Sequence, residues 1–472
     1  MDGNRSALEL WDGPTYQDIL DQDEQNIPEI IREHVVRDLG SEPISARRYT
    51  DAGFFMKEVE HVFLKTWQYA CRTEEIPEVG DSYIFDLVGR SLVVVRQRDG
   101  SIKALENVCG HRGRKIATQG GCKAALRCPY HGFTWEIDGS FRKSPVAWDF
   151  PEIDPANFPL FEARVAVWAG FVFVNFDRDA VPLEEVLGPL PRHFVQWRMD
   201  ECYKSAHVGK IMPANWKAVA EAFIENHHVS ATHPQIAAYI GDANSQYDTL
   251  SDHVTRAIGG LGMPGLVYEG GKMTPHQMLR GLGQVGRRMG TPPEVAPDSN
   301  VSVRRVMGDL YRQVLSEATG RDLSDVTDAE VVDSFSYDLV PNFHIWGGLG
   351  TKISYRFRPV GLDHESTFME VMLYKLAPID RPVPPPAQLR MLSDEDAWAG
   401  AHELEFLAGV FDQDEANMAP TQEGLKALGD RKIHFGRYSE IRCRNLHRMV
   451  DVYIAKGEAR AAKVQSGATD AP

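Results

Sequence analysis

Four metal-binding side chains between residues 109 and 131 constrain this chain more than any other feature. Cys109 and His111 form a Cys-x-His motif, and Cys128 and His131 form a Cys-x-x-His motif after an intervening loop. A Rieske 2Fe–2S cluster takes two thiolates on one iron and two imidazoles on the other. A structural zinc site is the alternative, but zinc fingers pair Cys with Cys and His with His. The mixed pairs therefore predict a Rieske cluster held by two loops.

The residues around these loops have the pattern of an all-β module. Ser91–Arg96 and Phe133–Ile137 are β-rich, and each is followed by an Asp-Gly pair that is typical of a hairpin turn. We expect a further strand over Arg164–Phe176 to end the module. The cluster loops are therefore predicted to belong to an antiparallel β domain.

A second group of candidate ligands follows in residues 215–234. A helix is predicted over residues 213–233, and it would place Glu221, Glu225 and His228 on one face. Pro234 disfavours helical geometry at His233, so that this second histidine can turn toward the metal that His228 faces. Two histidines and one carboxylate can hold a non-heme iron(II) and leave positions open for dioxygen.

The carboxylate for this site has three candidates in the later segment GVFDQDEANM. They are Asp412, Asp414 and Glu415. The spacing alone does not choose among them, and the segment by itself is also typical of a solvated acidic helix.

At this point the residues resemble a known family, the large (α) subunits of Rieske non-heme iron aromatic-ring-hydroxylating oxygenases. The resemblance covers about residues 45–430, and its most specific parts are NVCGHRGRKI, CPYHGFTWEIDG, residues 215–234 and FDQDEANM. It implies that His228, His233 and Asp414 hold the iron. It also implies that Glu225 bridges His228 to a cluster histidine of a neighbouring subunit. One departure is Ala222, where many members have asparagine.

The resemblance implies an α+β fold. An antiparallel β Rieske domain would precede a catalytic domain in which a curved antiparallel sheet carries a long helix, of the helix-grip type. The expected divisions are an N-terminal extension over 1–44 that packs on the catalytic domain, the Rieske domain over 45–180, the catalytic domain over 181–456 and a flexible tail over 457–472.

The implied function is that of a terminal oxygenase component. It would use dioxygen and reductase-supplied electrons to hydroxylate or dihydroxylate an apolar aromatic or polycyclic substrate. The alternative is oxidative N- or O-demethylation of a quaternary ammonium or methoxy substrate. Two other classes remain. The second group of candidate ligands argues against a Rieske electron carrier, which would not need it, and iron content and oxygen uptake would separate a binding module with a structural cluster from an oxygenase.

The expected cofactors are one 2Fe–2S Rieske cluster and one mononuclear non-heme Fe(II) per subunit. The sequence shows no flavin module and no second ferredoxin module. Electrons from NAD(P)H would therefore come through a separate reductase, with or without a ferredoxin. The resemblance implies a homotrimer, with or without a small β subunit.

The substrate pocket is predicted from residues near the ligands or on the later strands. Their aromatic rings suit an arene, and they can also hold a methylammonium group by cation–π attraction. The predicted pocket residues are Phe223, Val229, Phe335, Phe343, Ile345 and Trp346.

Charge and hydropathy bound the partners. The formal net charge of −16 argues against nucleic acid and anionic membranes. The longest apolar run, Val165–Val174, is about half of the roughly 20 residues that a transmembrane helix needs. The N-terminus lacks a basic segment followed by an apolar one, and the cysteines have no disulfide-type spacing. We therefore expect a cytoplasmic protein with no membrane contact.

Overall fold

The computed structural model describes residues 15–266, 273–285 and 290–465, and the chain divides into two compact units. The larger unit comprises Met1–Phe55, Val186–Phe357 and His364–Val452. The smaller unit comprises Met56–Glu185, Arg358–Asp363 and Tyr453–Pro472. Each unit is described below by itself.

The smaller unit contains two sheets. Its six-stranded sheet has the order β2-β10-β9-β5-β4-β3, and its three-stranded sheet has the order β6-β7-β8. All the recorded pairings in them are antiparallel, as expected for the Rieske domain. The strands are β2 (Gln68–Arg72), β3 (Ser82–Leu87), β4 (Arg90–Arg96), β5 (Ile102–Glu106), β6 (Leu126–Arg127), β7 (Thr134–Trp135), β8 (Phe141–Lys143), β9 (Glu162–Trp168) and β10 (Phe171–Asn175).

The segment expected to form one strand over Arg164–Phe176 is a hairpin instead. β9 and β10 pair with each other, with Phe171 opposite Trp168. Ala169 and Gly170 both have positive φ angles, +48° and +80°, which is the combination that a tight type I′ turn requires. The apolar side chains on both sides of the turn hid this reversal in the sequence.

The larger unit is built on an eight-stranded sheet with the order β12-β13-β14-β15-β16-β17-β11-β18. Its recorded pairings are antiparallel except for the short parallel pair of β11 with β18. The strands are β11 (Cys202–Met212), β12 (Gln246–Thr249), β13 (Val254–Gly259), β14 (Ser334–Leu339), β15 (Phe343–Gly347), β16 (Lys352–Val360), β17 (Asp363–Leu376) and β18 (Arg390–Met391).

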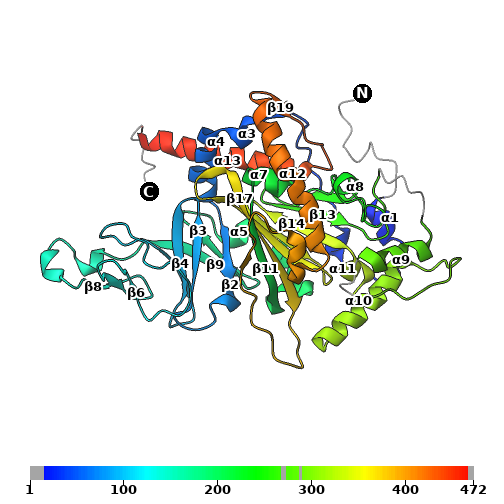
Figure 1. Cartoon of the computed structure of the whole chain (residues 1–472), viewed down its shortest axis with the longest axis horizontal. Helices are drawn as coiled ribbons and strands as arrows, with labels where there is room; N and C mark the ends of the chain where they lie inside the picture. Colours follow the sequence, from blue (N-terminus) through cyan, green and yellow to red (C-terminus); the bar gives the residue numbers. More distant parts are fainter. Residues whose placement is uncertain (1–14, 267–272, 286–289, 466–472) are drawn as a thin grey trace. The chain divides into compact units, whose positions relative to one another are not determined.

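A long helix, α12 (Leu407–Leu428), lies along this sheet and is drawn in orange in Figure 1. Its buried residues Leu407, Phe411, Met418 and Leu425 recur at helical spacing, so one face of the helix meets the core that also contains Val208, Tyr355 and Val371 from the strands. The antiparallel sheet and the long helix confirm the expected α+β fold class.

The other described helices that lie wholly within the larger unit are shorter than α12. α7 starts after the N-cap Asn215, whose side chain accepts a hydrogen bond from the backbone N–H of Lys217. The helices are α1 (Tyr16–Leu20), α2 (Glu29–Arg32), α3 (Arg47–Thr50), α6 (Leu190–Phe194), α7 (Trp216–Glu221), α8 (Val229–Thr232), α9 (Pro275–Val285), α10 (Val303–Thr319) and α11 (Asp328–Val332), and α4 (Ala52–Glu58), α5 (Leu183–Leu187) and α13 (Ile441–Gln465) run across the division between the units.

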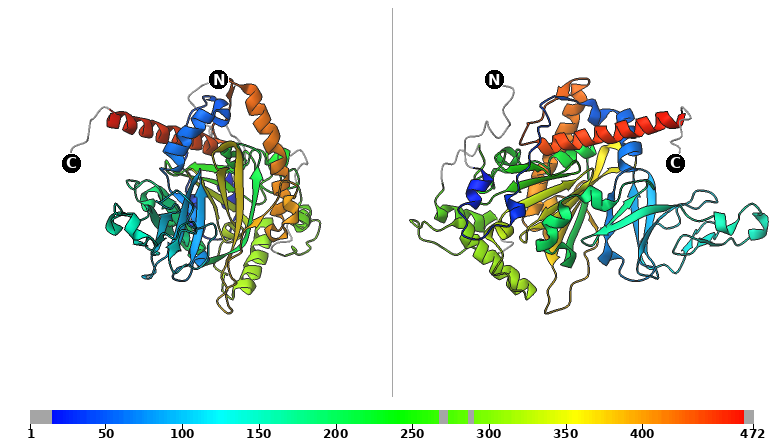
Figure 2. Two further views of the ribbon diagram at one scale, coloured as in Figure 1. Left: turned by 60° about the vertical axis from the view of Figure 1, so that its left-hand side comes forward. Right: turned by 180° about the vertical axis from the view of Figure 1, so that it is seen from behind.

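The N-terminal segment packs on the larger unit through buried polar contacts. Tyr16 donates a hydrogen bond to Asp333, at 2.8 Å, and Asp23 forms an ion pair with Arg304 of α10, at 2.7 Å. Arg304 also pairs with Asp333, so that one buried network joins the start of the chain to the end of α11. Figure 2 shows the dark blue helix α1 beside the green helices of this unit.

The unit boundaries differ from the divisions expected from the sequence. Residues 45–55 group with the larger unit rather than with the cluster-bearing one, because α3 packs there through Tyr49. The expected tail over 457–472 begins as helix, since α13 extends to Gln465 and ion pairs join Lys57 to Glu458 and Arg460 to Asp179. Residues 1–14 and 466–472 of the expected extension and tail lie outside the described residues. In the described ranges, no helix is both long enough and apolar enough to cross a membrane.

Candidate metal centres

The middle of α12 places one carboxylate on the buried face of the helix. Asp414 occurs at the spacing of the apolar residues Phe411 and Met418, and it is 3% exposed. The two neighbouring candidate acids make other contacts. Asp412 accepts hydrogen bonds from the backbone N–H groups of Trp398 and Ala399.

Glu415, the third candidate carboxylate, is also occupied elsewhere. It forms an ion pair with Lys210, at 2.7 Å. The fold therefore separates the three acids that the spacing left open, and only Asp414 faces the interior.

The two histidines come from a broken segment rather than from one long helix. α7 ends at Glu221, and a separate short helix, α8, starts at Val229. The expectation that Glu221, Glu225 and His228 share a helical face is therefore wrong. Instead, the Glu225 side chain accepts hydrogen bonds from the backbone N–H groups of His227 and His228, which stabilises the turn between the helices.

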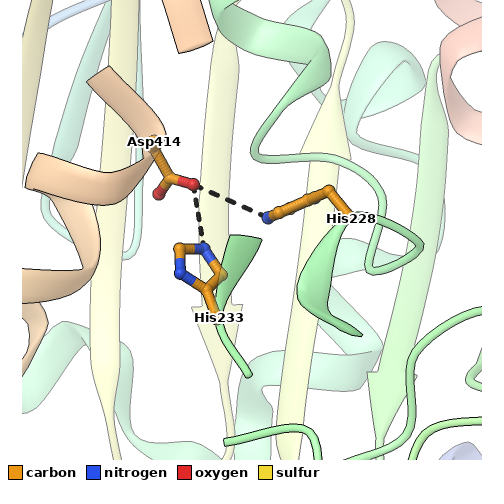
Figure 3. A group of neighbouring side chains, drawn as sticks. All are labelled: His228, His233 and Asp414. Atoms are coloured by element: carbon orange, nitrogen blue, oxygen red, sulfur yellow. Dashed lines mark ion pairs between the residues drawn. The ribbon is translucent and has the colours of Figure 1, made fainter. Parts of the chain in front are cut away.

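His228, His233 and Asp414 converge in space (Figure 3). One donor atom from each lies within 4.8 Å of the others. The Asp414 Oδ1 atom is 2.9 Å from Nε2 of His233 and 3.7 Å from Nε2 of His228. His227, in contrast, is exposed. The structure thus brings together the three side chains that the resemblance assigns to iron.

The other ring nitrogens of the two histidines have their own acceptors. Nδ1 of His228 is 2.6 Å from Glu225 Oε1, and Nδ1 of His233 is 2.8 Å from Gln413 Oε1. Burial disfavours the charged form of His228, but the contacts with Glu225 and Asp414 raise its pKa overall. Two Nε2 atoms and a carboxylate oxygen fit a divalent iron, because the Nδ1–H groups are already satisfied.

A cavity of about 240 Å³ opens beside these three side chains. Its lining is mostly aromatic and aliphatic, and the part of the chain that the structure describes contributes no lysine or arginine to it. Ligand pockets commonly measure about 300–1,000 Å³, so this one suits a compact molecule. The aromatic residues that line it are Phe223, Tyr239, Tyr311, Trp346, Tyr355, Phe406 and Phe411.

The residues predicted to line the pocket divide into two groups. Phe223, Val229 and Trp346 line the cavity. Phe343 and Ile345 do not, because side chains alternate along β15 and Trp346 points to the other face of the sheet. Phe335 packs against Trp197, with ring centroids 5.2 Å apart. For these last three residues the prediction has to be corrected, since they belong to the core.

The cluster loops of the smaller unit have matching backbone geometry. The N–H of Gly113 donates to the carbonyl of Cys109, at 2.9 Å, and the N–H of Gly132 donates to that of Cys128, at 3.0 Å. Both glycines have positive φ angles, +74° and +79°, which glycine adopts without strain. In each loop the backbone therefore makes a tight turn that begins at the cysteine.

The four side chains of these loops fit a Rieske cluster. Cys109 and Cys128 are buried and form no disulfide. The rings of His111 and His131 lie 4.6 Å apart, and His111 Nδ1 is buried without a hydrogen-bond partner. A buried ring nitrogen without a partner is rare, and a bound metal would satisfy it. The loops thus present two free thiols and two neighbouring imidazoles.

Residues 215–234, which carry the two histidines, also contribute to a buried hydrogen-bond cluster that the sequence did not predict. Glu221 accepts hydrogen bonds from Tyr49, at 2.8 Å, and from Nε2 of His447, at 2.7 Å, while Arg48 donates to the other ring nitrogen of His447. Burial raises the pKa of Glu221 to about 8, although Tyr49 and Lys217 act in the opposite direction. Its partners come from α3 and α13, far away in the sequence, so no local pattern signals them.

This raised pKa predicts a pH-dependent stability. A glutamate in an unfolded chain titrates near pH ~4.3, so between that value and about 8 the folded state binds a proton that the unfolded state does not. The free energy of unfolding should therefore fall as the pH rises through this window. We expect the Tm of wild type, relative to that of Glu221→Gln, to fall between about pH 6 and about pH 8.

The matched control for this measurement is Glu423→Gln on the exposed face of α12. Its thermal unfolding should follow the wild-type pH dependence. Equal slopes for wild type and Glu221→Gln would show that Glu221 keeps an ordinary pKa.

Comparison with known proteins matches both units. Residues 66–159 match the family described as Rieske [2Fe-2S] domain. Residues 192–456, more than half of the chain, match the ring hydroxylating alpha subunit (catalytic domain). The chain belongs to the ring-hydroxylating alpha subunits. The resemblance drawn from the sequence motifs is thereby confirmed.

The relatives of this alpha subunit include oxygenases for different substrates. It is 31% identical over 194 residues to the carnitine monooxygenase oxygenase subunit of Escherichia coli (strain K12), covering 40% of this chain and 52% of the relative. It is 33% identical over 198 residues to chlorobenzene dioxygenase subunit alpha of Cupriavidus sp. (strain PS12), covering 39% and 43%. The alignments thus span about half of each relative.

A solved structure agrees in fold with this alpha subunit. A quaternary ammonium Rieske monooxygenase superposes with a TM-score of 0.62 at 20% identity, over 88% of this chain and 96% of that one. The two family matches imply a Rieske cluster and a mononuclear iron, which are the cofactors expected from the sequence.

Proposed function

We propose that this alpha subunit is the terminal oxygenase of a Rieske system and that His228, His233 and Asp414 hold its catalytic iron. The observation that carries the proposal is the convergence of two imidazoles and one carboxylate on the wall of an aromatic cavity. Cys109, His111, Cys128 and His131 would hold the 2Fe–2S cluster. Iron bound at the triad supplies the activation of dioxygen.

The protein's own residues would position the metal and the substrate. Glu225 and Gln413 orient the two imidazoles, and the aromatic lining excludes water from the cavity. Hydroxylation of one C–H bond consumes dioxygen, two electrons and two protons, and it yields an alcohol and water. The electrons would come from NAD(P)H through a reductase, with or without a ferredoxin. The assembly would be a homotrimer, with or without a small β subunit.

For the substrate we propose a compact methylated ammonium compound that lacks a carboxylate. The cavity is small, its rings can bind a cation through their faces, and in the described part of its lining no lysine or arginine could pair with a carboxylate. Two of the similar proteins have names that refer to carnitine or quaternary ammonium. These observations favour the alternative drawn from the sequence over hydroxylation of a polycyclic substrate.

A second candidate is a small neutral arene. The apolar lining supports it, and so does the similarity to chlorobenzene dioxygenase subunit alpha. Such a ring would stack on the aromatic residues without needing a charge.

A matched substrate panel tests both candidates. Oxygen uptake and product mass would be measured for a trimethylammonium alcohol, its neutral tert-butyl isostere, a trimethylammonium carboxylate and a monocyclic arene. We expect kcat/KM to be at least about tenfold higher for the cationic alcohol than for its isostere, the equivalent of about 1.4 kcal/mol of cation–π attraction. If the arene is turned over and the trimethylammonium compounds are not, the second candidate is favoured. No oxygen uptake, together with no iron at the triad, would contradict the oxygenase itself.

A further inference from the structure

Gln413 and Asp414 are consecutive residues of α12, and they contact the two nitrogens of the same imidazole. Gln413 Oε1 lies 2.8 Å from Nδ1 of His233, and Asp414 Oδ1 lies 2.9 Å from Nε2 of that ring. Successive side chains on a helix diverge by about 100°, so neighbours can reach opposite edges of a ring that lies between them. One helix therefore fixes both sides of a buried ligand that belongs to another segment of the chain.

Gln235 forms a reciprocal amide pair with Gln413. Its Nε2 donates to Gln413 Oε1, at 2.7 Å, and the Gln413 Nε2 donates back to Gln235 Oε1, at 3.4 Å. A neutral imidazole that binds metal through Nε2 carries its proton on Nδ1 and needs an acceptor there. The carbonyl oxygen of Gln413 supplies that acceptor.

The two iron histidines thus have partners of different charge. Nδ1 of His228 contacts the carboxylate of Glu225, whereas Nδ1 of His233 contacts a neutral amide. A carboxylate partner increases the basicity of a ligating imidazole more than an amide does, because it adds negative charge. The carboxylates of Asp414 and Glu225 together balance the charge of an iron(II). A carboxylate partner for His233 as well would give the site a net negative charge.

We propose that Gln413 is a positioning residue for His233. It holds the ring in the orientation and tautomer that present Nε2 to the metal, and its neutral carbonyl limits the negative charge around the site. Gln235 braces it. This inference rests on the proposed iron site and extends it from the ligands to the partner that fixes one of them.

Two substitutions of Gln413 separate positioning from packing. Gln413→Leu removes the acceptor but keeps the size of the side chain, and Gln413→Glu keeps an acceptor but adds a charge. The control is Asn417→Ala, because Asn417 is exposed one turn later and its side chain donates a hydrogen bond to the backbone carbonyl of Gln413 rather than to the Gln413 side chain. The first readout is the affinity of the full chain, depleted of mononuclear iron, for Co²⁺ in competition with a fluorescent chelator. It requires neither substrate nor electron donor.

We expect Gln413→Leu to bind Co²⁺ about 10–100-fold more weakly than wild type, the usual effect of losing the partner of a metal ligand. Gln413→Glu and Asn417→Ala should stay within about threefold of wild type. The second readout is the midpoint potential of the mononuclear iron, which should be lower in Gln413→Glu because added negative charge stabilises the ferric state.

Wild-type Co²⁺ affinity in Gln413→Leu would overturn the proposal, and an unchanged potential in Gln413→Glu would overturn its charge component. If Gln413→Leu does not fold, Gln235→Ala removes only the brace and should still weaken Co²⁺ binding; unchanged binding there counts against the proposal. A wild-type protein that binds no Co²⁺ at His228, His233 and Asp414 would instead refute the proposed iron site.

Discussion

Replacing Asp414 with asparagine is expected to remove the mononuclear iron and to reduce turnover by at least about 100-fold, because loss of an outer partner alone commonly costs about 10–100-fold. The substitution keeps the shape of the side chain, so the buried face of α12 should still pack. In the described part of the chain, Asp414 is the only carboxylate grouped with both imidazoles as a candidate metal ligand, and the substitution removes that ligand. Iron content, measured separately from the labile sulfide of the cluster, is the direct readout.

Asp412→Asn is the matched control on the same helix. Asp412 accepts hydrogen bonds from the backbone of Trp398 and Ala399, and an asparagine oxygen can still accept one of them. This variant should retain its iron. An Asp414→Asn protein that keeps iron and turnover, or an Asp412→Asn protein that loses both, would overturn the assignment.

Replacing Glu225 with glutamine should leave both metal centres in place and slow electron transfer to the mononuclear iron by orders of magnitude. Glu225 lies 2.6 Å from Nδ1 of His228, so it fixes the ring that carries Nε2 toward Asp414. The family resemblance implies that this acid bridges to the cluster of a neighbouring subunit, and loss of its charge would then weaken that link. Single-turnover oxidation of a pre-reduced cluster in the presence of substrate measures the effect.

Two variants show whether the bond or the charge matters at this position. Glu225→Asp keeps the charge and shortens the reach, so its rate should lie between those of wild type and Glu225→Gln. Glu440→Gln removes a nearby acid, which accepts a bond from the backbone of Gly436 rather than from His228. If Glu440→Gln slows electron transfer as much as Glu225→Gln does, the loss of any nearby negative charge explains the effect. A wild-type rate in Glu225→Gln would show that no bridge operates.

The sequence predicted which side chains come together beside the cavity, but not the backbone that carries them. Cys109 and His131 were recognisable because few sites use mixed Cys-His pairs in two loops. The helix over residues 213–233 was predicted from periodicity, but α7 ends at Glu221. The bonds that Glu225 accepts from the backbone after it stabilise a turn there, and periodicity does not register such side-chain contacts.

Two further contacts were out of reach of the sequence for a different reason. Gln413 stands next to a predicted ligand, yet a neutral amide carries no pattern that marks it as the partner of a histidine. Tyr49 and His447 meet Glu221 only because helices from both ends of the chain pack together. Contacts of this kind depend on tertiary structure, which local residue spacing does not encode.

The network of Tyr16, Asp23, Arg304 and Asp333 has a practical consequence for engineering. Asp333 lines the cavity, and its buried carboxylate is neutralised by Arg304 and bonded by Tyr16. A chimera that exchanges the first thirty residues, or a truncation that removes α1, would therefore remove the Tyr16 hydrogen bond from an acid in the cavity wall. Directed evolution of substrate range in this chain should include the codons of its N-terminal helix, which are distant in the gene from those of every proposed ligand.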